Sequence, residues 1–275
     1  MPIVQISPDR KNSSDCLNYL DISPQQKEAV LLLHGLGATG ASWQLQIEAL
    51  QTAGMRIIAP DLPGFGNSKY NSPTWSIRGV ADILAQMMKN LVDQPVAVVG
   101  ISMGGVIALQ MGIDHPALVD RLVLVNTFAR FRPDSIKGWL YFLHRAVLVS
   151  ARGVAAQAPY VAKRIFPDPG QEMLRYILVD QILKSDPRVY RSAMRSLALF
   201  DSTRRLTSIK KAVLVISGEC DTTIPVKIQR QLVERIPKAR QVVIPQGGHA
   251  VIVDQPSIFN RVLLEFLQEP LTSTG

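Results

Sequence analysis

Ser102 lies in the pentapeptide G-I-S-M-G (residues 100–104), whose residue types and spacing could present a reactive hydroxyl. The pentapeptide follows the apolar run 95–99 and opens an amphipathic stretch that reaches about His115. Such a context predicts a strand, a sharp turn and a helix, with the serine on the turn. Small residues on both sides let the strand and the helix approach closely. The pattern therefore predicts that Ser102 is a nucleophile.

A serine hydroxyl is a weak nucleophile until a base takes its proton, and histidine suits that role near neutral pH. The chain has four histidines: His34, His115, His144 and His249. His249 follows two glycines, comes after the last predicted strand and precedes the final predicted helix. We interpret His34 as a loop residue, His115 as the end of a helix before a proline, and His144 as part of a helical segment. His249 is therefore the predicted base.

The base needs a carboxylate that fixes its tautomer and stabilises the imidazolium. Asp221 lies in a loop after the predicted strand 213–216, which is the expected end of a parallel strand for such a group. The end of the preceding strand offers only Asn126, which cannot carry the charge, and Glu219 is interpreted as a solvated loop residue. The order Ser102, Asp221, His249 is the nucleophile–acid–base order that accompanies this serine motif.

A carbonyl attacked by serine needs two donors for its developing oxyanion. One predicted donor is the backbone N–H of Met103, directly after the nucleophile. The other is the backbone N–H of Leu36, in the loop H-G-L-G (residues 34–37) that follows a predicted strand. His34 itself is interpreted as a brace for this loop.

Short apolar runs alternate with longer amphipathic stretches, which predicts an α/β fold with a mostly parallel sheet flanked by helices. The predicted strands are Ala29–Leu33, Arg56–Ala59, Val96–Val99, Leu122–Val125, Val213–Ile216 and Val242–Ile244, with Cys16–Ile22 as an added edge strand. The predicted helices are Ser42–Ala53, Ser76–Leu91, Gly104–His115, Lys227–Ile236 and Ser257–Leu267.

The alternation stops within residues 128–205, which we interpret as a helical cap inserted between core segments 1–127 and 206–275. One predicted helix carries the apolar stripe Ile136, Trp139, Leu140, Leu143 and Val147, and a second carries Leu174, Ile177, Leu178 and Ile182. A third begins at Asp186-Pro187, with Asp as its cap. From this cap, Trp139 and Phe142 are the candidate substrate-pocket residues.

The whole net charge of +8 is concentrated in this cap, which holds 14 Lys and Arg against 6 Asp and Glu. Such asymmetry can mark an acidic partner. We therefore consider an acidic carrier protein that docks through Arg188, Arg191 and Arg195. The alternative is a solvated, arginine-rich helical surface.

Composition excludes several classes of protein. Hydrophobic residues make up 47% and charged residues 19% of the 275 residues, a globular balance. No apolar run reaches the roughly 20 residues of a spanning helix, and the first residues do not resemble a signal peptide. Two cysteines, Cys16 and Cys220, suggest neither a disulfide framework nor a metal site, so we expect a cytoplasmic protein. The glycine-containing stretch 61–68 lacks a phosphate-binding pattern, which argues against a nucleotide enzyme, and no nucleic-acid partner is expected.

Five sequence blocks, at residues 34–37, 61–68, 100–105, 218–221 and 248–249, together resemble the α/β-hydrolase superfamily. More narrowly they are similar to its small serine-nucleophile branch, with a helical cap inserted after the sixth strand. The resemblance implies a carboxylesterase-like hydrolase without metal or organic cofactor. Ser102 departs from members with an aspartate nucleophile, such as haloalkane dehalogenases and epoxide hydrolases. Carbon–carbon bond hydrolases often have Trp after the catalytic His, where this chain has Ala250.

The sequence therefore predicts a serine hydrolase that cleaves a small-molecule carboxylic ester through an acyl-Ser102 intermediate. Three alternatives stay open. The same three side chains could serve a carbon–carbon bond hydrolase or a lyase, or could cleave an acyl ester held on an acidic carrier protein. A binding protein that keeps the fold without turnover would be expected to lack one of the three residues.

Overall fold

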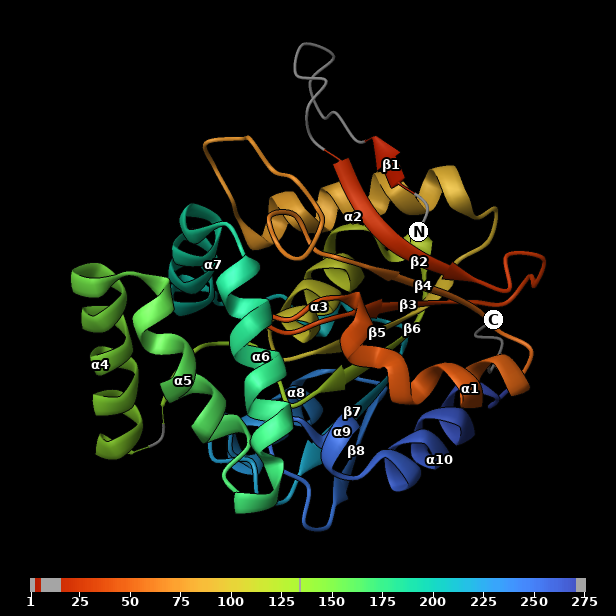
Figure 1. Ribbon diagram of the computed structural model, residues 1–275. Coiled ribbons are helices and arrows are strands. Elements are labelled where there is room, and N and C mark those ends of the chain that lie inside the picture. Colours follow the sequence, from red (N-terminus) through yellow and green to blue (C-terminus); the bar gives the residue numbers. More distant parts are fainter. Residues whose placement is uncertain (1–2, 6–15, 134, 271–275) are drawn as a thin grey trace.

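The computed structural model describes residues 3–5, 16–133 and 135–270, and its centre is one β-sheet (Figure 1). In this part of the chain the sheet has eight strands, in the order β1-β2-β4-β3-β5-β6-β7-β8. Strands β3 to β8 are parallel, β2 is antiparallel to β4, and β1 is antiparallel to β2. The strands are β1 (Ile3–Gln5), β2 (Cys16–Ile22), β3 (Ala29–Leu33), β4 (Arg56–Pro60), β5 (Val96–Ile101), β6 (Val119–Val125), β7 (Ala212–Gly218) and β8 (Ala239–Ile244). The predicted α/β fold with a mostly parallel sheet is confirmed.

Helices cover both faces of the sheet. One face packs against α2 (Ile77–Leu91), α3 (Met103–Asp114) and α8 (Val226–Arg235), and the other against α1 (Gln44–Thr52), α9 (Val251–Asp254) and α10 (Pro256–Leu267). Strand β3 shows the consequence: Leu31 and Leu33 join the first core, and Val30 and Leu32 join the second. Because both faces are covered, the strand is continuously apolar instead of alternating.

The strand Cys16–Ile22 is not the edge of the sheet, which corrects the sequence prediction. Strand β1 pairs outside it, with Ile3 opposite Asn18 and Gln5 opposite Cys16. A segment of only three residues is too short to show a hydrophobic period, so β1 could not be predicted from its pattern.

Four helices follow β6 and precede β7, and they gather at one end of the sheet (Figure 1). They are α4 (Ile136–Arg152), α5 (Val154–Ile165), α6 (Glu172–Lys184) and α7 (Pro187–Leu199). The α7 start matches the prediction, because the Asp186 side chain accepts the Arg188 N–H. Helix α5 was not predicted; it begins after Gly153, whose φ of 82° turns the chain out of α4. No helix of the described residues has the length and apolarity that crossing a bilayer requires.

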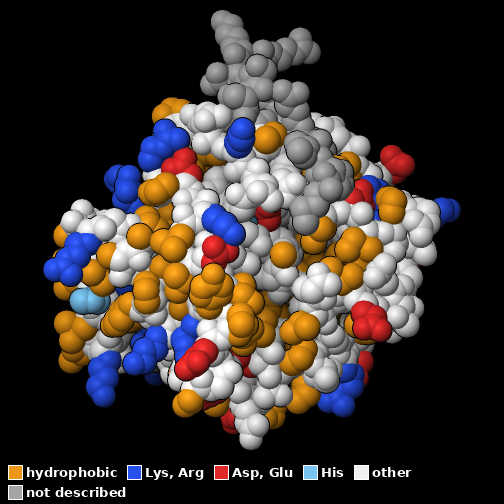
Figure 2. Space-filling view, viewed as in Figure 1, with side chains coloured by type: hydrophobic (Ala, Val, Ile, Leu, Met, Phe, Trp, Pro, Cys, Tyr) orange, Lys and Arg blue, Asp and Glu red, His pale blue; other side chains and the backbone are white. Residues whose placement is uncertain are grey.

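Helix α4 presents a different face to the protein from the one its apolar stripe suggested. The stripe side chains are more than half exposed: Ile136, Trp139, Leu140, Leu143 and Val147. The buried side chains of α4 are Tyr141, Arg145 and Val149. Figure 2 shows hydrophobic side chains interspersed with Lys and Arg over the helices α4 to α7. A charged residue on the inward face means that hydrophobic periodicity alone could not orient this helix.

Gly104 lies where α3 passes the end of β3, and it allows a test of this packing. A Cβ atom at this position would lie 2.1 Å from the Leu33 carbonyl oxygen and 2.8 Å from that of His34. Because backbone atoms would have to move, Gly104→Ala should lower the free energy of unfolding by about 1–3 kcal/mol. Urea denaturation measures the change.

The control is Gly170→Ala, since nothing lies within 4 Å of a Cβ there. This exposed substitution should change stability by less than about 0.5 kcal/mol. Equal denaturation midpoints for the two variants would contradict the close approach of α3 to β3.

Candidate active site

Ser102 alone forms the turn between β5 and α3, because β5 ends at Ile101 and α3 begins at Met103. Its φ of 54° and ψ of −113° are angles that residues with a side chain rarely adopt. The Ser102 N–H donates to the Val125 carbonyl at 2.9 Å, and the Thr127 hydroxyl donates to the Ser102 carbonyl at 2.8 Å. The serine thus occupies the sharp strand-to-helix turn expected from its pentapeptide.

Side chains larger than that of glycine would clash at the glycine positions around Ser102. A Cβ at Gly100 would lie 2.2 Å from the Gly104 carbonyl oxygen, and one at Gly105 would lie 2.6 Å from the Thr127 Cβ. Both distances are far below van der Waals contact. The strand can therefore turn directly into the helix only because these positions lack side chains.

Asp221 and His249 form a buried pair. The His249 Nδ1 lies 2.8 Å from the Asp221 Oδ2, and the side chains are 8% and 0% exposed. The other carboxylate oxygen accepts the N–H groups of Thr223 at 2.8 Å and Ile224 at 2.9 Å. Because both oxygens have donors, the carboxylate has one orientation, and it holds the imidazole through Nδ1. This leaves Nε2 of His249 for a second partner.

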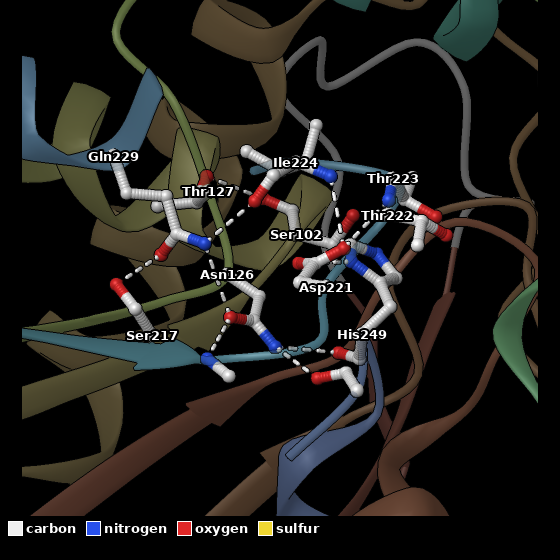
Figure 3. Close-up of polar contacts among 12 residues, drawn as sticks. Ser102, Asn126, Thr127, Ser217, Asp221, Thr222, Thr223, Ile224, Gln229 and His249 are labelled. Atoms are coloured by element: carbon white, nitrogen blue, oxygen red, sulfur yellow. Dashed lines mark hydrogen bonds and ion pairs between the residues drawn. The ribbon is translucent and has the colours of Figure 1, made fainter. Parts of the chain in front are cut away.

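Ser102 and His249 line the same cavity, although 146 residues of sequence separate them. Figure 3 draws Ser102, Asp221 and the imidazole ring of His249 in one group. The structure thus gathers Ser102, Asp221 and His249, which come from the ends of β5, β7 and β8, at one edge of the sheet. Ligands of open α/β sheets bind at this edge.

The structural role of the Asn126 side chain was not recognised from the sequence. Its amide nitrogen donates to the carbonyls of Gly248 at 2.9 Å and His249 at 2.8 Å. Its amide oxygen accepts the Gly218 N–H at 2.8 Å and the Gln229 Nε2 at 3.2 Å. The side chain therefore connects the ends of β6 and β7 to the loop that carries the histidine (Figure 3).

The place of Asn126, directly after a buried strand, could have indicated its role. Its φ is 43°, and asparagine tolerates this left-handed region better than most residues. An asparagine directly after a buried strand is thus suited to a tight, fully hydrogen-bonded corner. From the sequence, Asn126 was considered only as a residue that cannot supply the carboxylate.

The two predicted oxyanion donors lie beside Ser102. Met103 is the first residue of α3, so its N–H has no acceptor within the helix and lies at the positive end of the helix dipole. Leu36 lines the cavity, and a Cβ at the preceding Gly35 would be only 3.6 Å from the Ser102 Cβ. Their role as oxyanion donors stays a prediction.

His34 braces the loop that carries Leu36. It is fully buried; its Nε2 accepts the Leu62 N–H at 2.8 Å, and its Nδ1 lies 2.8 Å from the Gly35 carbonyl oxygen. Burial lowers the pKa of His34 to about 4. The neutral ring thus joins the loop after β3 to the loop after β4, where Asp61 accepts the Gly40 N–H at 2.9 Å.

The cavity that Ser102 lines has a volume of about 680 Å³. Phe142 is among its lining residues, as the sequence suggested. Trp139 is not: its side chain is 55% exposed on the outward side of α4, which corrects the prediction. Arg191 and Arg195 also line the cavity, whereas Arg188 is paired with Asp186 at 2.9 Å. Docking of a carrier protein on these arginines stays a prediction.

Comparison with known proteins identifies the family. The family model for the alpha/beta hydrolase fold matches residues 28–256. A protein of Variovorax paradoxus named "Putative carbamate hydrolase RutD" is 32% identical over 91% of this chain and 96% of its own length. The chain belongs to the α/β-hydrolase family. An Agrobacterium fabrum protein of the same name is 30% identical over 86% of this chain and 92% of its own length.

Solved α/β-hydrolases have the same fold over nearly the whole chain. A thermophilic esterase from Thermogutta terrifontis superimposes with a TM-score of 0.82 at 27% identity and covers 97% of this chain and 98% of its own. An enol-lactonase from Burkholderia xenovorans LB400 gives a TM-score of 0.85 at 23% identity, over 98% and 100%. The second likeness shows the fold alone.

The buried His34 predicts a pH dependence of stability. The unfolded chain binds a proton at its ordinary pKa of 6.5, whereas the folded chain resists protonation down to about 4. The contribution of His34 is therefore complete above pH 6.5 and is lost as the pH falls toward 4, by up to about 3 kcal/mol. Urea denaturation at a series of pH values measures it.

His34→Gln should remove this part of the pH dependence, while the exposed control His144→Gln should keep it. If wild type and His34→Gln lose stability in parallel between pH 6.5 and 4, the neutral buried imidazole is not the cause.

Proposed function

We propose that this α/β-hydrolase is a serine esterase, which cleaves a carboxylic ester through an acyl-Ser102 intermediate. The observation that carries the proposal is the buried Asp221–His249 pair, 2.8 Å from oxygen to nitrogen, at the cavity that Ser102 also lines. A carboxylate that holds Nδ1 keeps Nε2 of the histidine available as a base toward the serine.

In the first half of the proposed reaction, His249 takes the proton of the Ser102 hydroxyl as the oxygen attacks the ester carbonyl. The carbonyl oxygen becomes an oxyanion that accepts the N–H groups of Leu36 and Met103. The intermediate collapses, the C–O bond to the alcohol breaks, and His249 returns its proton to the leaving alkoxide. The products are the free alcohol and an acyl-serine ester.

In the second half, His249 takes a proton from a water molecule that attacks the acyl carbonyl. The new oxyanion occupies the same two N–H groups, and its collapse releases the acid and restores the Ser102 hydroxyl. Asp221 stabilises the imidazolium that forms in each half. These steps use only groups of the protein and water.

The cavity favours a substrate with a sizeable apolar part. Phenylalanine, leucine, isoleucine, valine and methionine side chains dominate its lining, among them Phe128, Phe131, Phe142, Leu178 and Met194. Burial of apolar surface contributes roughly 25 cal/mol per Å², so a medium-length acyl or alcohol chain would gain from this lining. A volume of about 680 Å³ lies within the usual range for small-molecule sites.

Relatives named carbamate hydrolases favour a second candidate, hydrolysis of a carbamate. A carbamate ester presents the same kind of carbonyl to Ser102, so attack would break the C–O bond to the alcohol and leave a carbamoyl group on Ser102. Water would then release a carbamic acid and restore the serine hydroxyl. Carbon–carbon bond cleavage remains a third candidate. Analysis of products from one substrate of each class separates the three.

Labelling of the nucleophile gives the first test. A fluorophosphonate probe should modify the wild-type protein and not Ser102→Ala, because only an activated serine attacks phosphorus at a useful rate. The Ser150→Ala variant, which changes another serine that lines the cavity, should be labelled like wild type. Equal labelling of wild type and Ser102→Ala would contradict the assignment.

The carboxylate gives the second test. Asp221→Asn should lower kcat for a 4-nitrophenyl ester by roughly 10⁴, because an amide cannot hold the reactive tautomer or stabilise the imidazolium. The matched control is Glu219→Gln in the same loop, which should keep kcat within about threefold, as exposed substitutions usually do. If Glu219→Gln lowers kcat as much as Asp221→Asn does, the wrong carboxylate has been assigned.

A further inference from the structure

Arg145 is a buried charge in the wall of the proposed active site. It lies on the inward side of α4, is only 7% exposed, and lines the same cavity as Ser102 and His249. The guanidinium stays protonated at any physiological pH. The steps proposed above do not use it.

The partners of Arg145 are all neutral. Its Nε donates to the Gln157 Oε1 at 2.9 Å, and its NH2 group lies 3.5 Å from the Tyr190 hydroxyl. The guanidinium carbon lies 5.7 Å from the ring centre of Tyr141 and 6.0 Å from that of Phe142. Burial raises the pKa of Tyr141, so this phenol remains uncharged near neutral pH. Within the described residues, no carboxylate lies within 4 Å of Arg145.

Other donors near Arg145 also lack acceptors. In the described structure the buried Nε2 of Gln157 and the buried Nε of Arg164 have no hydrogen-bond partner. Arg164 brings a second positive charge, 4.0 Å above the ring of Tyr141. Neither residue lines the cavity, and the Arg164 NH2 group donates to the Thr222 carbonyl, so Arg145 is the buried cation that a ligand in the cavity can reach.

The charged side chains that line the cavity, among the described residues, are all positive. Among the described residues, the Lys, Arg, Asp and Glu side chains that line it are Arg145, Arg191 and Arg195. Arg191 and Arg195 are exposed, so they add a positive potential without the cost of burial. Arg145 is different, because a buried charge without a counter-ion is costly and becomes favourable when a ligand supplies the anion.

We propose that Arg145 binds a carboxylate of the substrate, which makes the preferred substrate an ester with a second, anionic end that enters the cap. This rests on the proposed esterase function. A carboxylate matches the planar fork of a guanidinium, and the Tyr190 hydroxyl, which belongs to another residue of the cavity lining, can contribute a further hydrogen bond. Arg145 is thus a specificity-determining residue, and the chemistry at Ser102 does not depend on it.

Matched pairs of substrates test the proposal. The pairs are 4-nitrophenyl monoesters of adipic, pimelic and suberic acid and the neutral 4-nitrophenyl esters of hexanoic, heptanoic and octanoic acid. The wild-type kcat/KM should be higher for the carboxylate member of at least one pair. Arg145→Met should lower that preference by roughly tenfold or more, because a hydrogen-bonded charge pair is lost. Arg152→Met, an exposed change on the same helix, should leave the preference unchanged.

Two results would overturn the proposal: no wild-type preference for any carboxylate member, or the same preference in Arg145→Met as in wild type. If Arg145→Met does not fold, Arg145→Lys provides a second variant for the test. It keeps the charge but not the planar fork, so it should retain a weakened preference. A full loss of preference in Arg145→Lys, with neutral-ester activity intact, would assign the effect to the guanidinium geometry and support the proposal.

A binding measurement separates this proposal from the esterase function. By calorimetry, Ser102→Ala should bind octanoate at least roughly tenfold more tightly than octanamide, and the Ser102→Ala/Arg145→Met double variant should show no such difference. If the wild type cleaves no ester but this difference appears, the esterase proposal fails and the anion site stands. If esters are cleaved but octanoate and octanamide bind equally, the anion site fails alone. Activity on carrier-bound esters only, with no small carboxylate bound, would also contradict it.

Discussion

The backbone conformation of Ser102 is the constraint on which the rest of the site depends. A residue held at φ 54° and ψ −113° costs on the order of 1–3 kcal/mol, and the surrounding structure must supply that energy. Here the hydrogen bonds from Ser102 to Val125 and from Thr127 to Ser102 fix the backbone N–H and the carbonyl of Ser102. Gly100 lets β5 approach α3 closely, and Gly104 lets α3 pass the end of β3. The hydroxyl is therefore presented by a rigid corner.

His249 and Asp221 are positioned by a second set of polar contacts, which begins at Asn126. Its four hydrogen bonds join β7, Gln229 and the loop before His249, while two backbone N–H groups orient Asp221. The side chains of Asn126, Gln229 and Asp221 are buried, where an unmade hydrogen bond is costly and a made one is rigid. The arrangement is therefore formed before any substrate binds, which is the condition for electrostatic stabilisation of an oxyanion.

Sequence patterns predicted the parts of the molecule whose signals are local. The parallel strands are continuous apolar runs, and Asp186-Pro187 starts α7 as a capping pattern should. The helix after Ser102 was also predicted, although α3 is buried from Met103 to Ile113 and is not amphipathic as expected. Features set by tertiary contacts were not predictable. The three-residue strand β1 has no period, and the break between α4 and α5 depends on the left-handed Gly153.

The orientation of α4 illustrates the same limit. Its regular apolar stripe, including Trp139, suggested an inward face, yet the stripe is exposed and Arg145 is buried. Hydrophobic periodicity assumes that the core is apolar, whereas this helix borders a cavity whose wall includes a cation. The wall of the cavity therefore includes Arg145, a residue that hydrophobic periodicity assigns to the surface.

The most direct test of the account is rapid-quench mass spectrometry during turnover of a 4-nitrophenyl ester. Acid quenching within the first turnover should give a peptide containing Ser102 whose mass has increased by that of the acyl group, and the adduct should disappear once the substrate is consumed. An acyl group on another residue, with the Ser102 peptide unmodified at every time point, would contradict the central claim that this serine is the nucleophile.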